Sequence, residues 1–345
     1  MQKIVETDQR VVDEVERTKW KRVLTTLAKD WRLYVLLVPM LVFVFCFKYL
    51  PIGGILLGFK WGDGTNGNIY NDYWNGFYYM LELVDGSGAL YFWRAFRNTF
   101  VNSMYGLLLG FPIPILLALL FSEIKNQAYR SFLQVACYLP HFVSLVVVTS
   151  ILTLWCKGPS ASASVMKDGG AIYQMCLGMG LVDKGMDGGL LSQPKFFRPI
   201  YQISGIWEGA GYGSIVYFAA ICAISPTSYE AARIDGASKL QQIRYVTFPG
   251  MAPTLTIMLI MRVGQILNVG YEKIILLIGT EKTAWETGDV ISTYVYRQRA
   301  GNVDQGSLPV PQLGVVADLF NALIAMCLVL GANAISRRVS STSLF

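Results

Sequence analysis

Long apolar runs separated by polar segments dominate the sequence. A helix needs roughly 20 apolar residues to cross a bilayer. The runs are longer and more continuously apolar than barrel strands, which alternate over about 10 residues. We therefore predict an all-α membrane protein of six transmembrane helices, at residues 33–59, 98–122, 131–156, 199–224, 254–278 and 313–334.

The polar segments divide the chain into a first helix and a larger core. Four prolines inside the spans, Pro39, Pro112, Pro114 and Pro140, predict kinks. Residues 62–76 are rich in turn-forming dipeptides, and residues 166–182 predict a short surface helix. The expected organisation is a cytoplasmic N-terminal segment 1–32, a first transmembrane helix 33–59, an extracytoplasmic loop 60–97, a core of five transmembrane helices 98–335 and a cytoplasmic tail 336–345.

Composition agrees with this pattern. Hydrophobic residues make up 53% of the chain and charged residues 15%, whereas soluble domains carry roughly 25% charged residues. This excludes a soluble globular protein, a disordered chain and a small disulfide scaffold. Residues 1–32 are polar and lack an apolar h-region, so no cleavable signal peptide is expected.

The basic residues predict the orientation in the membrane. With both termini in the cytoplasm, the inner segments 1–32, 123–130, 225–253 and 335–345 hold 15 Lys and Arg. The longer outer segments 60–97, 157–198 and 279–312 hold 11. This bias follows the positive-inside rule. It also accounts for the net charge of +6 without a nucleic-acid partner.

Reactive side chains predict neither catalysis nor metal binding. His141 is the only histidine and lies in an apolar run, so a structural role is expected. The six cysteines form no C-x-x-C pair. Cys156 and Cys176 lie near one outer loop, and the sequence leaves open whether they form a disulfide or remain free thiols. No nucleophile–base pair is evident.

The inner segment 225–249 carries dense helix signals. Thr227 with Glu230, and Ser238 with Gln241, each fit a capping box. Gly236 between them is a helix stop. We predict a helix, a glycine elbow and a second helix that runs toward Pro249. Spacing alone leaves open whether this element docks another protein or packs on its own bundle.

This segment resembles the EAA loop of ABC importer permeases, whose pattern is E-A-A-x3-G-x9-I-x-L-P. Val246 and Phe248 stand in place of Ile and Leu. Other segments resemble the polysaccharide- and oligosaccharide-type branch of carbohydrate-uptake permeases, namely 138–142, 206–208, 235–238, 248–250, 268–270 and 293–296. The likeness covers roughly residues 30–340 and implies a type I, MetI-like permease bundle in a bacterial cytoplasmic membrane.

The resemblance also implies partners. An oligosaccharide would come from an extracytoplasmic solute-binding protein, and a second related permease subunit, or a second copy, would complete the channel. Two ATPase subunits would bind ATP and Mg, and this chain would bind no cofactor. It has no G-x-x-x-x-G-K-[ST] loop of its own. The implied ATPase-coupling residues are Glu230, Ala231, Ala232, Asp235, Gly236 and Pro249.

Polar residues inside the spans are candidates for the substrate path, because such residues are costly in a membrane. Residues 262, 265, 268 and 272 predict one polar face of the fifth span. Amides and carboxylates suit sugar hydroxyls, while Trp and Tyr suit pyranose faces; polar residues that join helices are the plain alternative. The candidates are Tyr201, Trp207, Glu208, Tyr212, Arg262, Gln265, Asn268, Glu272, Asp318 and Asn321.

Two other functions stay open at this point, and one packing motif remains to be interpreted. An ion-coupled secondary transporter would use Arg262, Glu272 and Asp318 as a relay. A membrane enzyme would need a catalytic cluster, and the acidic residues of loop 60–97 form no convincing pattern. Within the fourth span, Gly205, Gly209 and Gly213 have the G-x-x-x-G spacing, which predicts close helix packing rather than ligand contact.

Overall fold

The computed structural model describes residues 25–26, 28–61, 73–159, 168–183, 188–279, 284–300 and 310–339. The chain separates into two units, Met1–Leu56 and Leu57–Phe345. Most of the N-terminal segment, the turns expected at 62–72 and the end of the C-terminal tail lie outside the described residues.

The first unit is the first expected span. It comprises α2 (Trp31–Val44), a π-helical turn η1 (Phe45–Tyr49) and the start of the 3-10 helix η2 (Leu50–Phe59). Pro39 lies inside α2 without ending it. Residues 31–59 are together long and apolar enough to cross a membrane.

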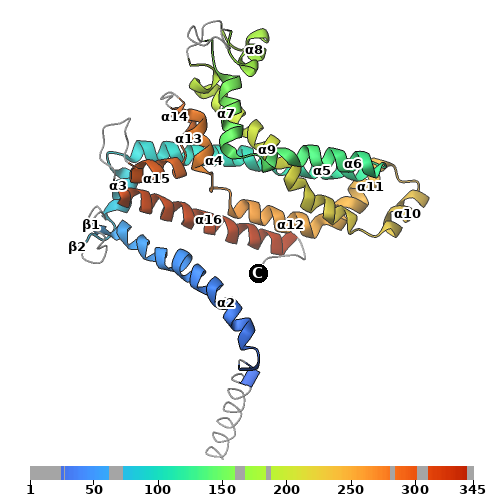
Figure 1. Ribbon diagram of the computed structural model, residues 1–345, viewed down its shortest axis with the longest axis horizontal. Coiled ribbons are helices and arrows are strands. Elements are labelled where there is room, and N and C mark those ends of the chain that lie inside the picture. The colour runs from blue at the N-terminus through green and yellow to red at the C-terminus, as the bar shows by residue number, and fades with distance from the viewer. Residues whose placement is uncertain are drawn as a thin grey trace, which may run out of the picture. The chain divides into compact units, whose positions relative to one another are not determined.

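The second unit is almost entirely helical (Figure 1). Its two short strands, β1 (Lys60–Trp61) and β2 (Tyr73–Trp74), pair antiparallel, with Lys60 opposite Trp74. Its helices are α3 (Tyr78–Asp85), α4 (Ala89–Gly110), α5 (Pro112–Glu123), α6 (Gln127–Tyr138), η3 (Leu139–Phe142), α7 (Leu145–Cys156), α8 (Ala171–Gly178), η4 (Leu190–Ser192), α9 (Pro194–Cys222), α10 (Pro226–Ile234), α11 (Lys239–Gln242), η5 (Ile243–Thr247), α12 (Phe248–Gly264), α13 (Tyr271–Ile278), α14 (Trp285–Gly288), α15 (Ile291–Ala300) and α16 (Pro311–Val339).

The spans correspond to six helical segments, two of which are sharply bent. Within the described residues, Trp31–Phe59, Ala89–Glu123, Lys239–Gly264 and Pro311–Arg338 qualify as single membrane-crossing helices. Two more spans arise if each bent helix pair counts as one: Gln127–Phe142 with Leu145–Cys156, and Pro194–Cys222 with Pro226–Ile234. The short helix expected within 166–182 is α8.

Two expected spans are wrong as continuous helices. The third, 131–156, bends by 92° between Phe142 and Leu145, next to the 3-10 turn that contains Pro140. Proline removes a backbone donor and disrupts helix geometry. The fifth, 254–278, stops at Gly264 and resumes at Tyr271. The helix that qualifies as a span here begins earlier, at Lys239, and continues through Pro249.

The second unit packs around three apolar clusters. One joins α5, α9 and α12 around Met251, and another joins α3, α4, α15 and α16 around Phe92. The third joins α7, α8, α9 and α13 around Phe197. Figure 1 shows α10 and α11 at one end of the stack of α5, α9 and α12, and α3 and α15 at the opposite end. This arrangement separates the loop 225–249 from α3 and α15, which belong to segments expected on the outer side.

Candidate functional site

The loop 225–249 forms the predicted helix, elbow and helix. Gly236 has φ +75°, a left-handed conformation that favours glycine. The amide of Ala237 donates to the Ala232 carbonyl at 2.9 Å, which closes the end of α10. The second capping box is confirmed, because Ser238 and Gln241 bond each other's backbone. The candidate residues Glu230 and Asp235 are exposed on this element.

The first capping box is wrong. The N-cap of α10 is Ser225, and Pro226 and Thr227 already lie in the helix. Proline suits the first helical position because its φ is preset and its missing amide is not needed there. The Thr227 hydroxyl instead lies 2.7 Å from the Ser225 hydroxyl.

The loop is also fastened to its own bundle. Tyr229 on α10 hydrogen-bonds Thr247 at 3.0 Å, at the end of the π-helical turn η5. Lys239 forms a salt bridge of 2.7 Å with Glu123 at the end of α5. These contacts connect α10 with η5 at the start of α12, and α11 with the end of α5. Ile234 and Leu240 remain 88% and 76% exposed, which leaves an apolar surface on the loop.

A polar cavity of about 370 Å³ lies between α4, α9 and the break after α12. We call it the central cavity. The break gives it its shape: after Gly264 the chain makes tight turns to Gly270 and then starts α13. Backbone that leaves a helix at membrane depth is tolerated where it lines a cavity or is buried in protein. Four predicted path residues line this cavity, namely Tyr201, Arg262, Gln265 and Asn268.

The polar stripe predicted on the fifth span is therefore only partly correct. Arg262, Gln265 and Asn268 share a cavity, but they do so across a turn and not along one helix. The break rotates α13, so that Lys273 lines the cavity while Glu272 is exposed and does not. Asn321 on α16 donates to the Leu267 carbonyl at 3.4 Å, within the broken segment.

Other predicted path residues lie outside the central cavity. Trp207 is 56% exposed, and Asp318 is exposed on α16. Tyr212 stacks on His141, with ring centroids 4.0 Å apart, which places that histidine against an aromatic ring. Among the described residues, no ion pair joins Arg262, Glu272 and Asp318.

All six cysteines are free, including Cys156 and Cys176.

Glu208 contributes to the cavity through a partner. Its carboxylate accepts from Lys273 Nζ at 2.9 Å, and the two side chains are 22% and 10% exposed. The Lys273 ammonium also lies 5.7 Å from the Tyr201 ring centroid. The pair neutralises the Lys273 charge beside the cavity.

The sequence reasoning missed Asn102 and Ser103 on α4. They are 2% and 7% exposed, and both line the central cavity. Neither the Asn102 side-chain amide nor the Ser103 hydroxyl has a hydrogen-bond partner among the described residues. Buried polar groups are rarely left without partners. The available signal was the helical spacing of Asn98 and Asn102 in a span without charge.

The glycines of α9 also differ from expectation. Gly205 and Gly209 line the central cavity, and a Cβ at Gly209 would meet nothing within 4 Å. Gly213 does pack on α5, where a Cβ would lie 3.5 Å from Pro114, but the tightest approach is at Gly211, where a Cβ would overlap the Cys137 carbonyl oxygen of α6. Gly211 lies two residues from Gly209, and so on nearly the opposite face of the helix, where the G-x-x-x-G spacing does not reach.

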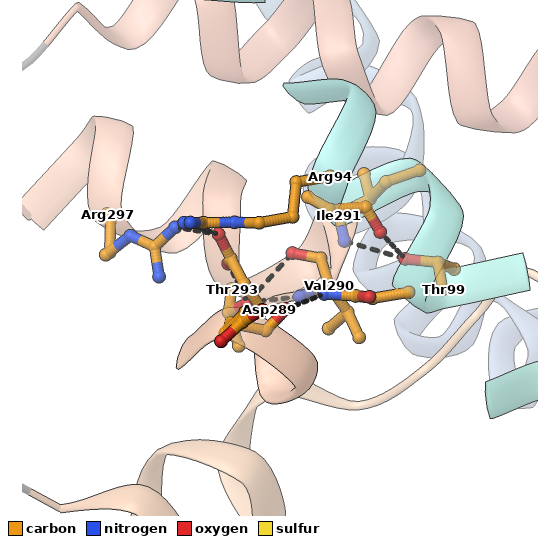
Figure 2. A network of polar contacts seen from close by, with 10 residues as sticks. Arg94, Thr99, Asp289, Val290, Ile291, Thr293 and Arg297 are labelled. Atoms are coloured by element: carbon orange, nitrogen blue, oxygen red, sulfur yellow. Dashed lines mark hydrogen bonds and ion pairs between the residues drawn. The ribbon is translucent and has the colours of Figure 1, made fainter. Parts of the chain in front are cut away.

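A buried polar network holds α4 to the start of α15 (Figure 2). Asp289 is fully buried and accepts from Arg94 at 3.4 Å and Arg297 at 2.6 Å. Its other oxygen accepts from Thr293 at 2.9 Å. Thr99 on α4 accepts from the Ile291 amide at 2.9 Å. The network therefore joins α15 and the residues just before it to α4.

Comparison with known proteins agrees with this architecture. A family model described as binding-protein-dependent transport system inner membrane component matches residues 110–341. The LplB protein of Bacillus subtilis (strain 168) is 31% identical over 93% of this chain and 93% of its own length. The polygalacturonan/rhamnogalacturonan transport system permease protein YteP of the same organism is 30% identical, over 99% of this chain and 100% of its own.

A solved structure is also similar. A chain of a bacterial ABC transporter involved in the import of the acidic polysaccharide alginate has a TM-score of 0.77 and 39% identity, covering 93% of this chain and 100% of that chain. The same kind of transporter, in complex with an alginate pentasaccharide-bound periplasmic protein, gives a TM-score of 0.75 and 38% identity, over 93% and 99% of the two chains.

These similarities confirm the expected helical permease fold and its multi-pass membrane class, and they give the ion-coupled alternative no support. Hydrolysis of ATP belongs to a separate chain in such transporters. This protein belongs to the family of binding-protein-dependent transport system inner membrane components, and it is a permease subunit of an ABC importer.

Proposed function

We propose that this permease carries an oligosaccharide across the bacterial cytoplasmic membrane through the central cavity. The observation that carries this proposal is the pair of buried groups without partners, Asn102 and Ser103, which face the cavity. An amide and a hydroxyl donate to and accept from sugar hydroxyls. Tyr201 supplies an aromatic face in the same cavity. The similarity to YteP and to the alginate transporter adds support, because both are described as transporting polymers of sugars.

We assign the coupling to the ATPase to α10 and the elbow that follows it. The exposed Glu230 would make polar contacts with an ATPase subunit, and Ala231, Ala232, Asp235 and Gly236 would shape the docking element. Pro249 lies beyond η5, in α12, and would receive the motion. The contact from Tyr229 to Thr247 provides a route for it. ATP and Mg would be bound by two ATPase subunits, with none on this chain.

The remaining partners follow from the same proposal. A second permease subunit, related or identical, would close the other side of the cavity. A solute-binding protein would deliver the sugar from outside, as the alginate transporter in complex with its periplasmic protein suggests. Both termini and α10 would face the cytoplasm, in accordance with the Lys and Arg bias.

The test is purification of this chain with its subunits after gentle extraction, followed by ATP-driven uptake in vesicles. The proposal expects two ATPase copies, a permease partner and uptake of oligosaccharides loaded on the co-expressed binding protein. A lone chain without an ATPase, or a complete complex that takes up ions or amino acids but no oligosaccharide, would contradict it.

A further inference from the structure

The face of α9 that lines the central cavity continues toward the start of the helix. Lys195, Arg198 and Gln202 follow at intervals of three and four residues, which place them on that same face as Gly205 and Gly209. The first three line a second cavity of about 510 Å³ between α4 and α9, which we call the outer cavity. Gln202 lines both cavities. The two are therefore neighbours along one surface.

Both cavities carry positive charge. Lys195 and Arg198 line the outer one, and Arg262 and Lys273 line the central one. No Asp or Glu lines either cavity in the described part of the chain. Of the four cations, only Lys273 has a carboxylate partner there, Glu208. The surface thus holds three cationic groups with no carboxylate partner in the part of the chain that the structure describes.

Nearby carboxylates do not neutralise the outer cavity. Asp289 is buried between Arg94 and Arg297, and Glu286 is exposed and lies outside the lining. Arg198 donates through Nη2 to Asn98 Oδ1 at 2.7 Å, but its buried Nε has no partner. Lys195 is exposed, and its Nζ lies 4.8 Å from the Phe196 ring centroid, a weak attraction that leaves its charge available. Arg198 is half-buried, so its unpartnered Nε carries a cost that an arriving anion would remove.

We propose that the outer cavity is a second station of the substrate path and that the oligosaccharide is acidic. Sugar carboxylates pair first with Lys195 and Arg198 and then with Arg262, because these cations lie along one continuous surface. Tyr105 and Pro199 give the outer cavity apolar walls that suit pyranose faces. This inference rests on the proposed oligosaccharide transport. An anionic lipid would satisfy the same charges, but the shared face of α9 and the shared Gln202 favour the path.

The test uses the complete importer, reconstituted in vesicles with its binding protein and with ATP on the cytoplasmic side. The probes are oligogalacturonate and oligomannuronate, each compared with the same oligomer after reduction of its carboxyl groups to alcohols. Lys195→Gln removes one cation. Lys157→Gln is the matched control, since Lys157 is an exposed lysine on an outer segment that lines neither cavity. Arg198→Lys keeps the second charge and should retain most of the uptake.

Uptake of the acidic oligomers is expected to fall about 3- to 10-fold in Lys195→Gln relative to Lys157→Gln, and the difference should narrow at high salt. Two results together would overturn the inference: the wild type takes up acidic and reduced oligomers equally, and Lys195→Gln lowers the uptake of neither form or of both forms equally. Transport of oligosaccharides would remain supported by that outcome. Uptake of a neutral oligosaccharide but of neither acidic oligomer would overturn the inference alone, whereas uptake of no oligosaccharide at all would overturn both. A fall that disappears in vesicles without anionic lipid would assign Lys195 to a lipid headgroup instead.

Discussion

The Lys273 ammonium lies 2.9 Å from the Glu208 carboxylate and thereby joins α13 to the middle of α9. Gly205 lies one turn away on α9, and a Cβ at this position would lie 3.9 Å from the Lys273 ammonium. Because the helix is interrupted between Gly264 and Tyr271, the orientation of α13 depends on contacts of this kind. The ion pair consequently helps to define one wall of the central cavity.

Breaking this pair should destabilise the protein and impair transport. Glu208→Gln leaves a buried ammonium without its counter-charge, and breaking a buried pair costs about 3–5 kcal/mol. We expect a lower thermal midpoint of the purified complex and reduced uptake. The exchanged pair, Glu208→Lys with Lys273→Glu, should recover part of both. A single variant as stable and active as the wild type would show that the pair is not structural.

The hydroxyl of Ser103 should matter for transport and not for folding. It is buried without a partner, so Ser103→Ala removes no internal hydrogen bond and should change the free energy of unfolding by less than about 0.5 kcal/mol. Loss of one sugar hydrogen bond, worth about 1 kcal/mol, should lower uptake about 5-fold.

Ser214 is the matched control for Ser103. It is also buried on a helix, but its hydroxyl donates to the Gly211 carbonyl at 2.6 Å. Ser214→Ala should cost about 1 kcal/mol of stability and leave uptake per folded complex near that of the wild type. Identical effects of the two substitutions would remove Ser103 from the substrate path.

The two glycine environments of α9 predict opposite outcomes for the same substitution. Gly211→Ala places a methyl group on the Cys137 carbonyl, where backbone cannot yield easily, so α6 and α9 must separate. Gly209→Ala places its methyl group in open space. We expect loss of folded protein for the first and wild-type thermal stability for the second, measured on purified protein. Equal stability of the two variants would contradict the α6–α9 contact.

The elbow after α10 should be sensitive to backbone conformation alone. Alanine at a left-handed position costs roughly 1–2 kcal/mol, whereas asparagine tolerates it better. Gly236→Ala should therefore lower the uptake per ATP hydrolysed more than Gly236→Asn does. The measurement is uptake and ATP hydrolysis in the same vesicles. An equally lowered ratio in both variants would indicate that the added side chain hinders a contact surface, and would contradict strain in the elbow as the cause.

The sequence by itself determined the class of the protein and the local form of its loop. Apolar runs of about 20 residues predict membrane-spanning helices directly, because a helix of that length and composition matches the thickness of the hydrocarbon core. The elbow at Gly236 and the capping box of Ser238 and Gln241 depend on neighbours within a few residues, so local pattern was sufficient. The family resemblance rested on this local element together with other short segments such as 138–142 and 293–296.

The tertiary structure decided which polar residues meet. The break at 265–270 and the bend after Phe142 rotate whole segments, and periodicity assumes an unbroken helix. For that reason Lys273 faces the central cavity and Glu272 does not. Asn102 and Ser103 became candidates only when α9 and the broken segment closed around α4 and left them without partners. Contacts between elements distant in the chain are set by packing, which spacing along one helix does not encode.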